Sequence, residues 1–393
     1  MRNLSIRIRL VEIAALLAIC LPTTAATPAE IQAAAVPAAL RGVSAAAMQL
    51  EGDVFQQRLD GGRRAVFTLD PAVQKFATSV LEDNDVPAGA VVLLNASTGR
   101  VIALAQHTRD GAKPDVAFDP SPPAASLFKI VTTAALLERT DVTVDTVQCY
   151  HGGSQRLETH NLIDSARDDS ACASVTEALG HSINAVFAKL SDRFLKPQTL
   201  REYAERFGFN QLLPFDFGVR QSTAEIPDER LERARAAAGF WHSHLSPLHA
   251  AMIAQSIAHN GAMLRPFIVD KVIGPDGATV FENKPQLYAR PISKATAARL
   301  RTAMRETVER GTARKAFHRG DLRGLKGISV AGKTGTLDGT DPYRAYSWFV
   351  GLAPADAPEV AIAVLVVNEP LWRIKSSETA ARVLNKYFSS KKK

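Results

Sequence analysis

Short apolar runs near both ends of the chain constrain the fold more than any other feature of this sequence. Tyr346–Gly351 and Val360–Val367 are typical of strands, and so are Ala90–Leu94 and Arg100–Ala105, which are separated by a turn sequence ending in Gly99. Two such runs joined by a short turn predict a β-hairpin. The sheet is therefore expected to be largely antiparallel and to be assembled from strands at both ends of the chain.

Helical patterns occupy much of the rest of the chain. Apolar residues recur at helical spacing in Pro71–Leu81, where Pro71 is a typical start signal. Further helices are expected over Ser126–Glu138 and Glu378–Phe388, and the stretch 140–260 reads as mostly helical with loops. The sequence therefore predicts an α+β fold, in which a mostly antiparallel central sheet is flanked by helices and carries an inserted all-helical subdomain.

The first 26 residues have the order of a secretory signal peptide. Three arginines within the first nine residues precede an apolar stretch, Leu10–Leu21, and small residues follow up to Ala26. The stretch is short for a membrane span, which needs roughly 20 residues. We expect export, with cleavage near Ala26 or an uncleaved N-terminal anchor as the alternative. The chain would then lie in the periplasm or on the outer face of the cytoplasmic membrane.

The remaining chain divides by composition. Residues 27–63 begin with an Ala- and Pro-rich stretch and are expected to be a linker, 64–388 one folded domain, and 389–393 a basic tail. Apolar residues make up 46% of the chain, which excludes global disorder. The net charge of +7 is spread along the sequence, and nothing resembles a nucleic-acid-binding module.

Two of the three cysteines form a candidate pair. Cys20 falls within the apolar N-terminal stretch, which leaves Cys149 and Cys172. In an oxidising compartment such a pair can form a disulfide. Two free buried cysteines are the alternative, and the sequence does not decide between them.

Ser126 and Lys129 are the first candidate catalytic pair. Residues three apart lie on the same face of a helix, so the lysine amine is expected one turn from the serine hydroxyl. A serine hydroxyl becomes a good nucleophile only when a neighbouring base takes its proton. A lysine can be that base where burial or a nearby positive charge disfavours its ammonium form. Because Ser-x-x-Lys is common by chance, its meaning depends on the other motifs.

A second motif, Ser182-Ile183-Asn184, lies on a helix or at its entrance. A serine hydroxyl can relay a proton, and an asparagine amide can bind both a substrate amide and a lysine. Taken alone the motif is weak, because polar residues near helix starts are usually caps.

A third motif follows an apolar run that ends at Ala331. Lys333 with Thr334 and Thr336 would form an edge that binds a carboxylate. Gly335 between them is expected to let a substrate backbone lie against the strand. A backbone N–H here and another at Ser126 could form an oxyanion hole.

Two rival sites are disfavoured. Gly327–Thr334 matches the P-loop pattern, but a P-loop opens a helix after its Lys-Thr, whereas Asp338-Gly339 and Asp341-Pro342 are typical of turns. No nucleotide site is therefore expected. His242 and His244 are separated by a single residue, and such a pair is more often found at a cleft rim or in a core than at a metal.

The three motifs, in this order, resemble those of the penicillin-binding protein transpeptidase family, in the serine D,D-peptidase and β-lactamase-like superfamily. The long gap between Asn184 and Lys333 resembles the transpeptidases more than the compact β-lactamases. Gly311-Thr312-Ala313 and Trp348–Gly351 also fit the family pattern. The resemblance covers roughly residues 64 to 388, which would form the transpeptidase domain.

The resemblance implies a D,D-transpeptidase that acts on D-Ala-D-Ala stem peptides in peptidoglycan cross-linking. Ser126 would attack the peptide carbonyl, Lys129 would take its proton, and Ser182 would relay a proton to the leaving amine. Asn184 would orient the substrate amide. The terminal carboxylate would be held by the third motif, which comprises Lys333, Thr334, Gly335 and Thr336.

The same resemblance implies the ligands and partners. β-Lactams would mimic the substrate and acylate Ser126. No cofactor or metal ion is implied, and cell-wall synthesis proteins at the membrane would be further partners.

Other activities share these motifs. A D,D-carboxypeptidase uses the same first half-reaction and transfers the acyl group to water. Class A β-lactamases use a Glu-x-x-Leu-Asn segment that is absent after Ser182, and a class D-like β-lactamase tends to carry Val in place of Asn184. A β-lactam sensor would need a signalling partner. The sequence does not decide between transpeptidase and carboxypeptidase.

Three departures from the family pattern leave substrate preference open. Ala124-Ala125 stands before the nucleophile where Pro-Gly is usual. The segment 242–244 replaces common glycines, and His249 stands where Gln is usual.

Overall fold

The computed structural model describes residues 36–111, 115–340 and 343–391 of the 393-residue chain. The signal peptide or anchor predicted over 1–26 lies outside the described residues, as does the first part of the predicted linker. Within the described part, no helix combines the length and the apolar character needed to cross a bilayer.

The described part of the chain contains ten α-helices and sixteen strands. The helices are α2 (Pro71–Asp83), α3 (Phe128–Arg139), α4 (Val175–His181), α5 (Asn184–Phe194), α6 (Pro197–Arg206), α7 (Arg230–Ala238), α8 (Pro247–Ala258), α9 (Lys294–Glu309), α10 (Arg314–Phe317) and α11 (Ser376–Lys391). The strands are β1 (Gln49–Glu51), β2 (Val54–Arg58), β3 (Arg64–Phe67), β4 (Ala88–Asn95), β5 (Val101–Thr108), β6 (Val147–Tyr150), β7 (Ala171–Ser174), β8 (Thr223–Ala224), β9 (Ser243–His244), β10 (Met263–Leu264), β11 (Val269–Ile273), β12 (Thr279–Glu282), β13 (Leu287–Ala289), β14 (Ala331–Thr340), β15 (Tyr343–Ala353) and β16 (Val360–Asn368).

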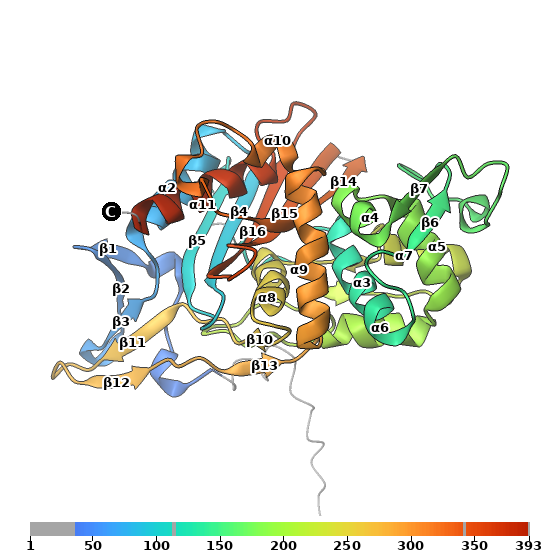
Figure 1. The fold of residues 1–393 in the computed structure, drawn as a ribbon. Helices are drawn as coiled ribbons and strands as arrows, with labels where there is room; N and C mark the ends of the chain where they lie inside the picture. The colour runs from blue at the N-terminus through green and yellow to red at the C-terminus, as the bar shows by residue number, and fades with distance from the viewer. Residues whose placement is uncertain (1–35, 112–114, 341–342, 392–393) are drawn as a thin grey trace, which may run out of the picture.

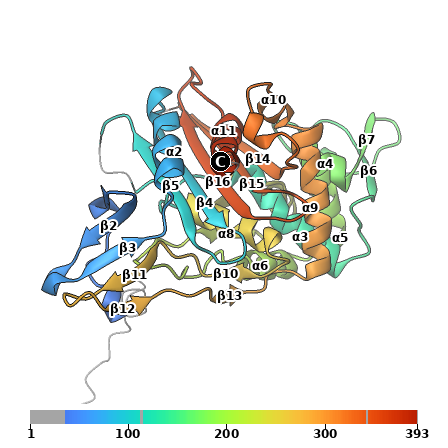
Figure 2. The same ribbon diagram turned by 60° about the vertical axis from the view of Figure 1, so that its left-hand side comes forward.

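A five-stranded sheet forms the centre of the molecule (Figure 1). Its strands lie in the order β14-β15-β16-β4-β5, and every neighbouring pair is antiparallel. Strands from the end of the chain therefore pair with strands from its beginning, as predicted. Helices α2 and α11 cover one face of the sheet and α8 covers the other, which Figure 2 shows from the side.

Strand β4 shows how the sheet divides the interior into two cores. Ala90, Val92 and Leu94 pack in the core that contains α8, while Val91 and Leu93 pack in the core that contains α2 and α11. Successive side chains of a strand point to opposite faces. Because both faces are covered, the strand reads as a continuous apolar run rather than an alternating one.

The segment between α3 and α8 forms a lobe beside the β14 edge of the sheet (Figure 1, green). It is helical except for two ribbons, β6-β7 and β8-β9. A disulfide joins Cys149 and Cys172, which face each other across the β6-β7 ribbon. Of the two alternatives that the sequence left open, the structure has the disulfide.

The folded part begins upstream of the boundary predicted at residue 64. Strands β1 and β2 lie within the predicted linker and join a second sheet in the order β1-β2-β3-β11-β12. Leu40, Val43 and Leu59 of the same segment are buried in the core. These short strands are stabilised by their pairing and burial rather than by their own sequence.

Two predicted turns or ends also differ from the structure. Strand β14 continues to Thr340 and includes Asp338-Gly339, because this segment pairs with β15 along its whole length; Asp341-Pro342 lies outside the described residues. Helix α11 runs to Lys391 and therefore includes most of the predicted basic tail.

Candidate active site

Ser126 lies in a short 3-10 helix, η4 (Ala125–Leu127), that leads directly into α3. Lys129 is in the first turn of α3 and is fully buried. Its Nζ donates a hydrogen bond to Ser126 Oγ at 2.8 Å, and also to Asn184 Oδ1 at 2.6 Å and to the carbonyl oxygen of Ala238 at 2.5 Å. The predicted serine and lysine are therefore in contact.

The residue before Ser126 has a backbone conformation that alanine seldom adopts. Ala125 has a φ of 50°, in the left-handed region that favours glycine. The turn is held from both sides, because Trp348 Nε1 donates to the carbonyl of Pro123 at 2.9 Å and Ala124 N donates to the carbonyl of Ser243 at 2.8 Å. These contacts explain how the chain keeps Ser126 in place without the glycine that the family usually has here.

A pair of glycine variants tests this strain. Ala124 and Ala125 are adjacent and both buried, but Ala124 has a φ of −65°. Each substitution removes one methyl group and adds freedom to the unfolded chain, whereas only Ala125→Gly relieves a left-handed alanine. We expect the free energy of unfolding of Ala125→Gly to exceed that of Ala124→Gly by about 1 kcal/mol in urea titrations. Equal values for the two variants would contradict the proposed strain.

Ser182 and Asn184 occupy the tight turn between α4 and α5. Ser182 ends α4 in the left-handed conformation, with φ 58° and ψ 42°, and Asn184 begins α5. Left-handed residues commonly end helices. Asn184 accepts a hydrogen bond from Lys129 through Oδ1 and donates one to the carbonyl of Ser154 at 2.7 Å through Nδ2. The turn therefore brings the second motif to the first.

Lys333 brings the third motif to the same place. It is buried on β14, and its Nζ donates to Ser182 Oγ at 2.8 Å and to the carbonyl of Thr334 at 2.7 Å. Thr334 and Thr336 alternate along the strand and line one cavity. Thr334 Oγ1 lies 2.5 Å from Thr312 Oγ1, a contact that joins β14 to the loop after α9.

Gly335 has a packing role that the sequence analysis did not foresee. A Cβ atom at this position would lie 3.3 Å from the Cβ of Ala125 and 3.4 Å from the backbone nitrogen of Ser126. The glycine therefore lets the turn that carries Ser126 approach β14. Gly239 also approaches this turn, since a Cβ atom there would lie 2.3 Å from the carbonyl oxygen of Ala125.

Burial controls the protonation of both lysines. Burial and the positive charge of Lys333 lower the pKa of Lys129 well below its usual value. Burial alone lowers the pKa of Lys333 to about 7. A lysine whose ammonium form is disfavoured in this way can accept the proton of a serine hydroxyl.

The predicted residues meet at one cavity of about 400 Å³. Its lining includes the predicted residues Ser126, Ser182, Asn184, Thr334 and Thr336, and the buried lysines contact it through Ser126 and Ser182. The lining also includes residues to which the sequence analysis gave no role, namely Ser154, Thr312, Ser347, Trp348, Trp372, Lys375, Ser376 and Ser377. Thr312 and Trp348 lie in segments that fit the family pattern, but no pattern pointed to the others.

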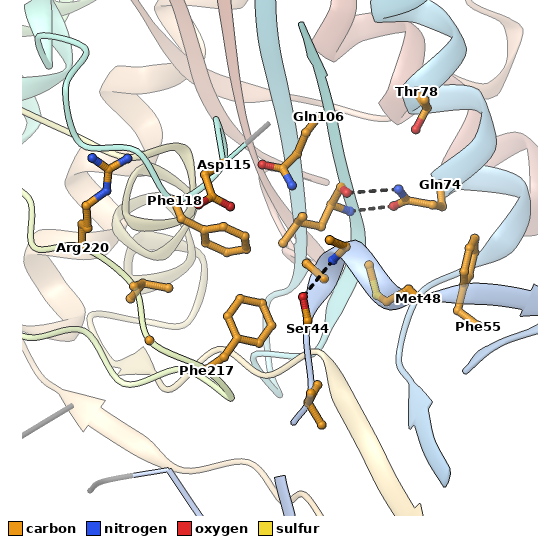
Figure 3. A pocket seen from close by; sticks show the side chains of 16 residues that line it. Ser44, Met48, Phe55, Gln74, Thr78, Gln106, Asp115, Phe118, Phe217 and Arg220 are labelled. Atoms are coloured by element: carbon orange, nitrogen blue, oxygen red, sulfur yellow. Dashed lines mark hydrogen bonds between the residues drawn. The ribbon is translucent and has the colours of Figure 1, made fainter. Parts of the chain in front are cut away.

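A larger cavity of about 520 Å³ lies at the opposite edge of the sheet (Figure 3). It is lined by Leu104 and Gln106 of β5, by Gln74 of α2 and by Phe118 and Phe217. The Gln74 amide both donates to and accepts from the backbone of Leu104, at 3.0 and 2.7 Å. Because β5 and β14 are the two edges of the sheet, this cavity is separate from Ser126. Size alone therefore does not identify the site.

The histidines that depart from the family pattern do not line the site cavity. His242 Nε2 lies 2.8 Å from Glu232 Oε2, and His244 pairs with Pro123 in an isolated bridge. His249 is buried in α8 beside the carbonyl of Phe207. In the described part of the chain, no group of three or more His, Cys, Asp or Glu side chains is placed to hold a metal ion.

The arrangement has the groups that acyl transfer needs. A serine hydroxyl contacts a buried lysine whose pKa is lowered, and a second serine contacts a second lysine across the same cavity. The antiparallel sheet, the helical lobe and these paired contacts at their junction define a serine acyl-transfer enzyme with a lysine base.

Comparison with known sequences shows which family of serine enzymes this chain is similar to. A family model described as the penicillin binding protein transpeptidase domain matches residues 89–389. The chain is 30% identical over 353 residues to peptidoglycan D,D-transpeptidase PbpA of Mycobacterium tuberculosis, covering 80% of this chain and 70% of that protein. It is 27% identical to stage V sporulation protein D of Bacillus subtilis, covering 80% of this chain and 51% of that protein.

Solved structures agree with the sequence comparison. The fold matches the D,D-transpeptidase domain of a peptidoglycan glycosyltransferase from Eggerthella lenta with a TM-score of 0.71, at 27% identity and 85% coverage of both chains. It matches penicillin-binding protein A from M. tuberculosis, in its ceftriaxone acyl-enzyme complex, with a TM-score of 0.67, at 26% identity and with 84% and 80% of the chains covered. The chain belongs to the penicillin-binding protein transpeptidase family, which confirms the predicted family and fold class.

Proposed function

We propose that the chain is an exported peptidoglycan D,D-transpeptidase that acts on D-Ala-D-Ala stem peptides through an acyl-enzyme on Ser126. The observation that carries the proposal is the meeting of three separate motifs at one cavity. Lys129 Nζ lies 2.8 Å from Ser126 Oγ, and Lys333 Nζ lies 2.8 Å from Ser182 Oγ. Relatives named as D,D-transpeptidases support the choice of reaction.

The first half-reaction breaks the bond between the two D-alanines. Ser126 Oγ attacks the carbonyl carbon of the penultimate residue while Lys129 Nζ accepts its proton. Backbone N–H groups at Ser126 and Thr336 stabilise the negative oxygen. The C–N bond then breaks, and Ser182 relays a proton to the leaving amine, which departs as free D-Ala. Lys333 remains protonated and, with Thr334 and Thr336, holds the substrate carboxylate.

The second half-reaction releases the enzyme. An amine from a neighbouring stem peptide attacks the ester on Ser126, and its proton returns through Lys129 to the serine oxygen. The product is a cross-link between two peptides. If water attacks instead, the same site trims the peptide as a D,D-carboxypeptidase. β-Lactams enter the first half-reaction and leave Ser126 acylated.

Location and partners belong to the same proposal. The basic and apolar N-terminal residues support export to the periplasm or the outer face of the cytoplasmic membrane, where peptidoglycan is assembled. Cell-wall synthesis proteins at the membrane are proposed as its partners there.

The proposed reaction is tested with the full-length chain and two substrates. Benzylpenicillin is followed by intact-mass spectrometry over time, and a peptide ending in D-Ala-D-Ala is supplied together with an amine acceptor. We expect a persistent adduct of one drug molecule per chain and a ligated peptide product. An adduct that clears within seconds while the drug is consumed would instead indicate a β-lactamase. Hydrolysed peptide without ligation would indicate a carboxypeptidase, and no adduct would refute the acyl-enzyme.

The acylation rate should have a bell-shaped dependence on pH. Lys129 must lose its proton to act as a base, so the rate rises with pH through its lowered pKa. Lys333 must keep its proton to hold the carboxylate, so the rate falls as pH rises through about 7. Second-order rate constants for benzylpenicillin, measured between pH 5 and 10, would show the rising and the falling limb, each with a slope of about one decade of rate per pH unit. In Lys333→Arg the falling limb should vanish, whereas a wild-type rate that still climbs beyond pH 9 would contradict the assignment.

A further inference from the structure

The segment from Trp372 to Ser377, which follows β16 and ends in the first residues of α11, forms a wall of the cavity that neither the three motifs nor the proposed reaction uses. Trp372, Lys375, Ser376 and Ser377 of this segment line the same cavity as Ser126. Trp372 is half-buried and Lys375 is exposed. They are therefore available to a molecule that occupies the cavity.

Buried hydrogen bonds fix the backbone of this wall. The fully buried side chain of Asn368 donates from Nδ2 to the carbonyl of Ile374 at 3.2 Å and accepts from Arg373 N at 3.0 Å through Oδ1. Ser347 Oγ accepts from Ser376 N at 3.3 Å and lies 2.9 Å from Ser376 Oγ. Both ends of the wall are thus attached to the central sheet, so its side chains are presented from a rigid support.

The ammonium group of Lys375 has no carboxylate to neutralise it among the described residues. Its Nζ forms no ion pair with any of them and lies 5.9 Å from the centroid of the Trp372 ring. None of the residues that line the cavity is acidic. Asp338, two residues beyond Thr336 on β14, is also absent from the lining. The wall therefore adds positive charge next to an aromatic surface.

The wall also lies at a different part of the motif strand from Lys333. Thr336 pairs with Ser347, and Ser347 is bonded to Ser376, the residue after Lys375. Lys333 is three residues back along β14 and contacts Ser182. A substrate whose terminal carboxylate is held from the Lys333 end of the strand would thus extend its acyl portion, on the other side of the scissile bond, toward Lys375.

We propose that Lys375, supported by Trp372, forms a second anion subsite that binds a carboxylate on the acyl portion of the stem peptide or β-lactam. This inference rests on the proposed function, because it assumes that the acyl group is attached to Ser126. Lys375 binds the carboxylate by charge, and the indole ring of Trp372, 5.9 Å from Nζ, favours the cation beside it. The enzyme therefore prefers acyl donors that carry a side-chain carboxylate over otherwise equal neutral ones.

Two penicillins that differ by one carboxylate provide the test. Carbenicillin is benzylpenicillin with a carboxylate on the side-chain α-carbon. The second-order acylation rate constants of both drugs are measured by intact mass, and their ratio cancels any general effect on the site. We expect the ratio of carbenicillin to benzylpenicillin to fall about threefold to fivefold in Lys375→Gln, the size typical of a partly exposed ion pair. Raising NaCl from about 0.05 M to 0.5 M should lower the ratio in wild type but not in the variant.

Lys386 supplies a matched control. It lies on α11 with its Nζ 6.0 Å from the ring centroid of Phe76, and it does not line the cavity. Lys386→Gln should leave the ratio unchanged. A ratio that is the same in wild type and Lys375→Gln, or that falls equally in both variants, would overturn the subsite while leaving the proposed function intact. Failure of both drugs to acylate wild type would instead refute the proposed function.

Discussion

The Ser126→Ala variant is expected to form no covalent adduct with benzylpenicillin and to release no D-Ala from a stem peptide. Ser126 Oγ is the hydroxyl that contacts the buried amine of Lys129, at 2.8 Å. Removing the nucleophile of a serine enzyme costs on the order of 10⁶ in turnover, so the rate should fall by at least about 10⁴-fold, below detection. Intact-mass spectrometry after a long incubation at saturating drug measures this directly.

Two further serine variants complete the experiment. Ser79→Ala removes a hydroxyl that bonds the carbonyl of Phe76 within α2, away from the cavity, and should leave adduct formation unchanged. Ser182→Ala should slow the adduct without abolishing it, because Ser126 and Lys129 remain together. An adduct that forms at the normal rate in Ser126→Ala, or that maps to Ser182, would show that Ser126 is not the nucleophile.

The contact between Ser126 and Lys129 could be predicted because it is local. Three residues of helix fix the distance between the two side chains whatever the rest of the fold does. The contact between Lys333 and Ser182 joins residues 151 positions apart. Only the resemblance to a family pointed to that contact. The periodicity of the sequence does not predict that β14 lies at the edge of the sheet, beside the helical lobe.

The wall of Trp372 and Lys375 was missed for the same reason. These residues lie in an irregular segment, and their place in the cavity depends on the pairing of Thr336 with Ser347 and on the bond from Ser347 to Ser376. Gly335 was assigned to the site from its place in the third motif, but its packing against Ala125 could be seen only once the turn and the strand were side by side.

The predicted linker shows the limit of local sequence patterns at the N-terminus. Leu40, Val43 and Leu59 are widely spaced in a segment that contains many small and polar residues, so no strand or helix period is visible. Each is nevertheless buried in the core, and β1 and β2, which lie between them in the chain, add to the sheet that contains β3 and β11. Tertiary pairing overrides weak propensity in such short strands.

Replacing Lys129 by methionine is the second change expected to have a very large effect. Methionine is similar in length and apolar, so it can occupy the buried position, but it cannot accept a proton. Burial and the charge of Lys333 hold the pKa of Lys129 well below its usual value, which is the condition for a lysine base. We expect benzylpenicillin acylation to slow by about 10³-fold, the size typical of a lost general base. Stopped-flow or quenched mass measurements across a range of pH would record it.

The same experiment separates the role of the base from the role of the charge. In Lys129→Met the rising limb of the pH profile should no longer report the lysine pKa, and the residual rate should follow hydroxide. Lys129→Arg keeps a cation that stays protonated throughout this range, and should be about as slow as the methionine variant. Thermal unfolding of both proteins shows whether the fold is kept. A folded Lys129→Arg enzyme that acylates within tenfold of wild type would mean that Lys129 acts by its charge. The proton of Ser126 would then need another acceptor, and among the residues that line the cavity the candidates are hydroxyls, an amide and Lys375.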